Sequence, residues 1–182
     1  MGLILAVAVL SAADEKDFFP VKAGAKWTYA AGEEEVTVTV EGPAKVGEKE
    51  CHVFKREWKG GSSKEFFSVT DQGVFLVRLE ADRNTEFPDN PVPRMKFGTK
   101  KGETWTWKFE QQEGTYENQG EEEIEVPAGK FKAWKIHVVA QAGEMKYVTT
   151  RWFAAGVGLV REEMKRGDQT RITELKKFEL PK

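Results

Sequence analysis

Alternation of apolar and polar side chains is the feature that most restricts how this chain can fold. In residues 34–41, Val36, Val38 and Val40 fall on one face, and the intervening threonines fall on the other. Residues 103–109 and 131–139 show the same pattern. A period of two residues is that of a half-buried β-strand. From Asp14 onward no window keeps a 3.6-residue apolar period for three turns, so the sequence predicts an all-β protein.

Turn signals rich in Gly, Pro, Asn and Asp separate these segments. Examples are "EGPAKVGE", "KGGSS", "TDQG", "VPAG" and "KRGD". Turns that recur every ten or so residues favour antiparallel hairpins in a barrel or sandwich. We therefore expect an antiparallel meander barrel or half-barrel, with residues 14–182 forming a single β domain.

Two collinear sequence matches indicate an internal repeat. "KAGAKWTY" at 22–29 matches "KKGETWTW" at 100–107, and "DQGVFLVR" at 71–78 matches "AAGVGLVR" at 154–161. The order of the matches favours duplication of one β-meander over chance similarity. The predicted halves span about 18–80 and 96–165. Because neither half has many strands, we expect them to close on each other and share a core.

The stretch "AAGVGLVR" contains the start of a glycine-rich nucleotide-binding turn, Gly156-x-Gly158. That fingerprint requires a third glycine where Arg161 stands, and the matching copy has Phe75 in place of Gly158. We interpret Gly73 and Gly156 as turn glycines that open a strand. Gly158 is predicted to permit close approach of a large side chain such as an indole.

The connection between the halves, 81–95, is rich in proline. Pro88, Pro91 and Pro93 remove backbone donors and favour an extended path. The segment is either a plain linker or a lid over a cavity mouth, with Phe87 and Val92 as its apolar contacts.

The N-terminus suggests export. Residues 3–10 are apolar and precede the small residues Ser11 and Ala13, a pattern typical of a secretory signal peptide over residues 1–13. No Lys or Arg precedes the apolar run, and the alternative is a core strand. Eight helical residues would span only about 12 Å, against a hydrocarbon core of roughly 30 Å, so the segment is not predicted to span a membrane.

Charge and motif content argue against several classes of function. A net charge of -2 provides no basic field for nucleic acid. No His, Cys or carboxylate cluster has structural zinc spacing, and Cys51 and His52 are neighbours that point to opposite faces of a strand. No Gly-x-Ser-x-Gly elbow is present, although an enzyme using surface carboxylates stays open as a third hypothesis. We expect no catalytic residues, no metal and no cofactor.

Aromatic residues stand out, with six Trp, twelve Phe and three Tyr. Burying one such ring is worth roughly 4–6 kcal/mol, so a small β-core could use several of them only to fold. The alternative is that some line a ligand cavity between the halves. The candidate lining residues are Trp27, Trp105, Trp107, Trp134 and Phe87.

Three motifs resemble the TapB-like family of exported bacterial β-domains of unknown function. They are "PVKAGAKWTY" at 20–29, "VPAGKFKAWKI" at 126–136 and "RWFAAGVGLVRE" at 151–162. The similarity covers about residues 18–163, with Phe153 where the family usually has Tyr. The resemblance implies an exported antiparallel β fold, broadly like lipocalin or lipoprotein-carrier barrels, and it brings no catalytic residues.

The leading hypothesis is an exported (periplasmic or secreted), non-catalytic module that binds an apolar or amphipathic ligand between its halves. The alternative is a structural or protein-interaction domain of the cell envelope with a filled core. The expected partner is accordingly a hydrophobic small molecule or an envelope protein, and not nucleic acid.

Overall fold

The computed structural model describes residues 14–181, and the predicted signal peptide at 1–13 lies outside them. The described part is an antiparallel sheet with one short 3-10 helix, η1, at Glu15–Phe18. The strands are β1 (Lys26–Ala31), β2 (Glu34–Val46), β3 (Lys49–Trp58), β4 (Gly61–Thr70), β5 (Gly73–Glu80), β6 (Thr85–Glu86), β7 (Val92–Lys96), β8 (Thr104–Phe109), β9 (Gln112–Val126), β10 (Gly129–Ala142), β11 (Met145–Ala154), β12 (Gly158–Arg166) and β13 (Gln169–Glu179).

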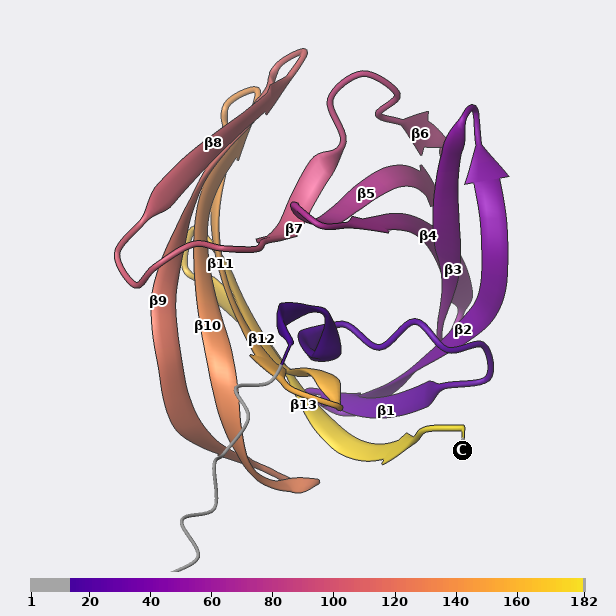
Figure 1. The fold of residues 1–182 in the computed structure, drawn as a ribbon. Helices are drawn as coiled ribbons and strands as arrows, with labels where there is room; N and C mark the ends of the chain where they lie inside the picture. The colour runs from indigo at the N-terminus through magenta and orange to yellow at the C-terminus, as the bar shows by residue number, and fades with distance from the viewer. Residues whose placement is uncertain (1–13, 182) are drawn as a thin grey trace, which may run out of the picture.

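The sheet curls into an open half-barrel. Its strand order is β6-β5-β4-β3-β2-β1-β13-β12-β11-β10-β9-β8, and β7 pairs with β5 off this path. Strands β2 to β5 form one wall, strands β8 to β12 form the other, and β1 and β13 join them (Figure 1). The all-β prediction is confirmed. Of the two predicted forms the half-barrel is the one observed, since β6 and β8, which end the path within residues 14–181, do not pair with each other.

The matched sequence stretches occupy corresponding places in two five-strand meanders. Trp27 in β1 pairs with Val38 in β2, and Trp105 in β8 pairs with Tyr116 in β9. The meanders β1 to β5 and β8 to β12 each carry a register shift between their fourth and fifth strands. This agreement in pairing supports the duplication hypothesis, which stays a prediction about the origin of the chain.

The N-terminal segment lies on the concave side of the sheet, between the two walls (Figure 1). Phe18 is buried and packs edge-to-face on Trp134, with ring centroids 5.6 Å apart. The backbone N–H of Gly156 donates to Asp17 O at 2.8 Å, and that of Gly98 donates to Glu15 Oε2 at 2.7 Å. These contacts attach η1 to the second meander and to the turn between β7 and β8, so the space between the walls is partly filled from within the chain.

The proline-rich connection bridges the two ends of the sheet path. Phe87 packs against Trp107 and Phe109, with ring centroids 5.9 and 5.0 Å away. The carbonyl of Asn90 accepts a hydrogen bond of 2.8 Å from Trp107 Nε1. Val92 begins β7 and pairs with Leu76. The connection therefore supplies two short strands and apolar contacts to β8.

No helix within residues 14–181 has the length and apolar character needed to span a membrane.

Candidate functional site

A cavity of about 250 Å³ opens on the concave side of the half-barrel. Side chains from β1 to β4 line it on one side, and side chains from β11 and β12 line it on the other. Of the five residues predicted to line a cavity, Trp27 is in this wall. The full lining is Phe19, Pro20, Trp27, Tyr29, Val38, Phe54, Arg56, Ser63, Glu65, Phe67, Arg94, Arg151, Phe153, Gly158, Leu159, Glu162 and Met164.

Aromatic rings form one part of the cavity wall. Phe19, which follows η1, lies 5.0 Å from Phe54, 5.1 Å from Phe67 and 6.5 Å from Phe153, measured between ring centroids. Trp27 stacks on Phe54 at 6.1 Å. These rings come from both meanders and from the N-terminal segment, so this wall exists only when all three are assembled.

Trp27 is held in place by the start of β12. Its Nε1–H donates to Val157 O at 2.6 Å, and a Cβ placed on Gly158 would lie 3.8 Å from the indole. Gly158 has a φ of +94°, a conformation that favours glycine. The predicted close approach of an indole at Gly158 is confirmed. Tyr29 makes a second hydrogen bond to this region, since its hydroxyl donates to Leu159 O at 2.9 Å.

Two ion pairs form another part of the lining, and the guanidinium of Arg94 lies 5.4 Å from the Phe67 ring. Arg94 Nη2 donates to Glu65 Oε1 at 2.5 Å, and Arg151 Nε donates to Glu162 Oε2 at 2.6 Å. The side chains of the second pair are only 12% and 15% exposed. Charge-assisted hydrogen bonds are the stronger class, and such partial burial limits their screening by solvent.

These charges shift the pKa values of the groups between them. Burial alone would raise the pKa of Glu162, but Arg151, Arg56 and Arg94 together hold it below its ordinary value. Burial would likewise lower the pKa of Arg94, and Glu65 and Glu162 reverse that shift so that the pKa is raised. Glu162 is therefore an anion, and Arg94 a cation, at neutral pH.

Arg56 is the charged residue of the cavity without a carboxylate partner. The cavity wall holds three guanidinium groups and two carboxylates. Glu65 pairs with Arg94 and Glu162 pairs with Arg151, and within residues 14–181 no carboxylate oxygen lies within 4.0 Å of an Arg56 nitrogen. The wall thus carries one excess positive charge, at Arg56.

The other four predicted lining residues lie elsewhere in the interior. Trp105 stacks on Tyr116 at 5.5 Å, and Trp134 Nε1 donates to Asn118 Oδ1 at 2.8 Å. Trp107 and Phe87 contact each other at the seam between β8 and the connection. All four are buried. The structure separates these aromatic residues from Trp27 and does not gather the five into one site.

The charged lining residues were missed because charge on a strand usually indicates the solvated face. A signal was nevertheless present in the sequence: Arg56 is two residues from Phe54, and Arg151 is two residues from Phe153. Alternation places each arginine on the same face as its aromatic neighbour. A charged residue that alternation places on the apolar face of a strand could therefore have been predicted to lie in the interior.

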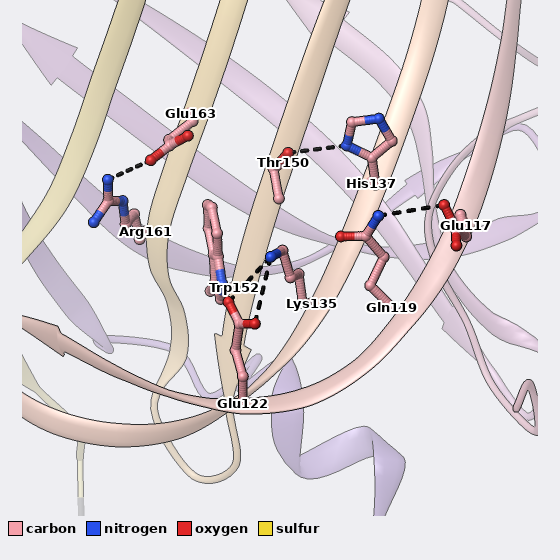
Figure 2. Close-up of polar contacts among 9 residues, drawn as sticks. All are labelled: Glu117, Gln119, Glu122, Lys135, His137, Thr150, Trp152, Arg161 and Glu163. Atoms are coloured by element: carbon pink, nitrogen blue, oxygen red, sulfur yellow. Dashed lines mark hydrogen bonds and ion pairs between the residues drawn. The ribbon is translucent and has the colours of Figure 1, made fainter. Parts of the chain in front are cut away.

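The opposite face of the second meander carries a set of polar contacts (Figure 2). Trp152 is covered by Lys135 Nζ at 5.3 Å and by the Arg161 guanidinium at 5.5 Å, and its Nε1–H donates to Glu122 Oε1 at 2.6 Å. His137 Nδ1 lies 3.0 Å from Thr150 Oγ1. None of these residues lines the cavity.

The structure does not combine Cys51 and His52 into a reactive pair. Cys51 is buried in a small cluster with Val53, Phe66 and Val77, and burial raises the pKa of its thiol. His52 Nδ1 is buried without a hydrogen-bond partner in the described chain, and burial lowers the pKa of its ring. No group of three or more metal-ligating side chains occurs among residues 14–181.

Solved structures place the half-barrel in a known fold class. It resembles a crystal structure of a Bacteroides fragilis protein predicted to be exported, with a YmcC-like fold: the TM-score is 0.57, the identity is 15%, and the match covers 90% of this chain and 99% of that one. A predicted lipoprotein from Parabacteroides distasonis matches with a TM-score of 0.50 and 14% identity, over 89% and 98% of the two chains. At such identities the similarity establishes the fold alone.

The chain is thus an all-β protein with a YmcC-like half-barrel fold. It belongs to the DUF3108-like family, whose family model matches residues 79–173. That match extends from the end of β5 into β13 and so includes the whole second meander. The comparison with curated proteins gives no significant match.

Proposed function

We propose that this protein is an exported, non-catalytic binding module for a small amphipathic molecule. The observation that carries the proposal is the cavity, which is lined both by aromatic rings and by three arginine side chains. Sites for small molecules are typically concave and mostly apolar, with a few polar groups that orient the ligand. The lining described here has that composition.

The size of the cavity restricts the ligand. About 250 Å³ lies just below the roughly 300–1,000 Å³ that is typical of pockets for drug-sized ligands. Met164 lines the cavity and is 37% exposed, which places part of the lining at the surface and gives a ligand an entry point. The proposed ligand is therefore short, with a single apolar chain or ring.

Export is supported by two independent observations. Residues 1–13 have the apolar and small-residue pattern of a signal peptide. The two proteins of similar fold are described as a predicted exported protein and a predicted lipoprotein. The motif similarity to the TapB-like family agrees with this location and remains part of the proposal.

The proposal is tested by titrating the purified protein with decanol, using calorimetry and tryptophan fluorescence. We expect saturable binding and a higher melting temperature, since a ligand that binds only the folded state stabilises it by mass action. Val38→Phe should abolish binding by filling the cavity. Its corresponding position in the second meander is Tyr116, which stacks on Trp105, so an aromatic ring fits this place in the fold.

Trp107→Phe is the matched control, because Trp107 is buried but does not line the cavity. It should retain decanol binding even if the protein becomes less stable. If neither decanol nor an ionic ten-carbon amphiphile binds the wild-type protein or changes its melting temperature, the binding-module proposal is wrong. The envelope domain with a filled core would then be favoured.

A further inference from the structure

We infer that the ligand of this cavity carries a single anionic head group, and that Arg56 binds it. The inference rests on the proposed function and specifies the ligand class. The supporting observation is the charge of the cavity wall. Two of its three guanidinium groups form ion pairs with carboxylates, and the third, Arg56, does not.

Arg56 shares the inner face of the half-barrel with the cavity aromatics. In β3 it is two residues beyond Phe54, and it pairs with Val38 on one side and Ser63 on the other. All three of these neighbours line the cavity. An apolar ligand chain that lies against Phe54 is therefore close to Arg56, which is two residues further along β3 on the same face.

The fold itself does not require a charge at this place. In the second meander, the pairings of Trp105 with Tyr116 and of Tyr116 with Val138 repeat those of Trp27 with Val38 and of Val38 with Arg56. The residue that corresponds to Arg56 is thus Val138, which is buried. An aliphatic side chain is sufficient to build this position, so the arginine serves something other than the sheet.

The two neighbouring ion pairs favour one anion and disfavour a cation. Arg94 and Arg151 each hold a carboxylate at 2.5–2.6 Å, which neutralises Glu65 and Glu162. A cationic head group would have to compete with these arginines and would meet Arg56 unpaired. An oxyanion can accept two parallel N–H bonds from the planar guanidinium, which is the geometry that arginine prefers.

The experiment compares ten-carbon ligands that differ only in the head group. Decanoate, decyl phosphate, decanol and decyltrimethylammonium are titrated into the full protein at neutral pH and below their critical micelle concentrations. Decanoate or decyl phosphate should bind at least about tenfold more tightly than decanol, with an advantage that decreases as salt is added. Whichever of the two anions binds with the higher affinity identifies the head group as carboxylate or phosphate.

Arg56→Gln should lower the affinity for decanoate and decyl phosphate to about that for decanol, and Arg56→Lys should restore part of the advantage. Saturable decanol binding by Arg56→Gln would show that the cavity still forms in the variant. Arg171→Gln, at an exposed position outside the lining, controls for the change in net charge.

Equal binding of decanol and the two anions, or preference for the ammonium ligand, would overturn the inference and leave the binding module standing. An anionic preference that Arg56→Gln does not reduce would also overturn it. Absence of binding by all four ligands would instead reject the proposed function, and with it the inference.

Discussion

Arg78 and Arg161 hold corresponding positions in the two meanders and make the same set of contacts. Arg78 lies opposite Phe66 with its guanidinium 5.3 Å from the ring, and Arg161 lies opposite Trp152 at 5.5 Å. Each forms ion pairs with the glutamate two residues later and with a glutamate on the next strand. The pairings are Arg78 with Glu80 and Glu86, and Arg161 with Glu163 and Glu174.

Replacing either arginine by lysine should destabilise the protein by about 1–2 kcal/mol. A lysine ammonium cannot cover the aromatic ring and bridge two carboxylates at once, whereas a planar guanidinium can. Urea denaturation of Arg78→Lys and Arg161→Lys measures the loss. Lys130→Ala, which removes one exposed ion pair, should cost less than about 0.5 kcal/mol. A loss for the two arginine variants no larger than that of the control would contradict the shared role.

Gly73→Ala should be more damaging than Gly156→Ala, although the two glycines align in the sequence repeat. Both have a positive φ, +148° and +72°. A Cβ on Gly73 would lie 2.1 Å from Met95 O, whereas a Cβ on Gly156 would meet no atom within 4 Å. We expect a loss of at least about 3 kcal/mol for Gly73→Ala and about 1–2 kcal/mol for Gly156→Ala. Equal losses in thermal or urea denaturation would show that β7 does not lie against β5 as described.

Asn118→Ala should cost about 2–4 kcal/mol, because one buried amide satisfies several groups. Its Oδ1 accepts from Trp134 Nε1 at 2.8 Å and from the Gly120 N–H at 2.7 Å, and its Nδ2 donates to Thr99 O at 2.9 Å. The variant leaves each of these groups without that partner. Gln119→Ala is the neighbouring control and should change the free energy of unfolding by less than about 0.5 kcal/mol. A small loss for Asn118→Ala would indicate that water replaces the amide.

The protein should lose stability in acid because the stabilising charge of Glu162 is lost there. Its pKa in the folded protein is held below the ordinary value of 4.5 by Arg151, Arg56 and Arg94, against the effect of burial. The stabilisation is therefore fully present above about pH 4.5 and is lost as the pH falls toward the folded pKa. Glu162→Gln should be less stable than wild type at neutral pH, and the difference should shrink below that value.

Urea denaturation at a series of pH values tests this dependence. Glu113→Gln, which removes one carboxylate at an exposed position, is the control and should keep a wild-type profile. A difference between wild type and Glu162→Gln that stays constant from neutral to acidic pH would show that Glu162 is not held as an anion by these arginines.

Local patterns in the sequence predict the strands well, since alternation and turn residues act over short distances. Val36, Val38 and Val40 are buried as their spacing predicts, and Gly158 meets an indole. The matched stretches predict that Val74, Leu76, Val157 and Leu159 face the core; the first three are buried there, and Leu159 is partly buried against it. The open form of the barrel and the position of η1 depend on contacts between distant segments, which strand periodicity does not encode.

The candidate site was harder to predict, because its chemistry depends on which faces meet. Trp27 and Trp105 match in sequence, but only Trp27 reaches the cavity. The difference lies in their partners: Trp105 is covered by Tyr116, whereas the smaller Val38 pairs with Trp27 and leaves room. Arg56 pairs with the same small residue, Val38, and lines the same cavity. Its charge alone did not predict this interior position.

The pairing of β1 with β13 has a consequence for how the molecule is made. Trp27 lies opposite Phe178, so β1 completes its hydrogen bonds only when β13 is in place. Contacts across such sequence separations slow folding and prolong exposure of unpaired strand edges. During synthesis the first meander must therefore keep one edge open until β13 has been made. A chaperone that shields strand edges would have its greatest effect on this protein during that interval.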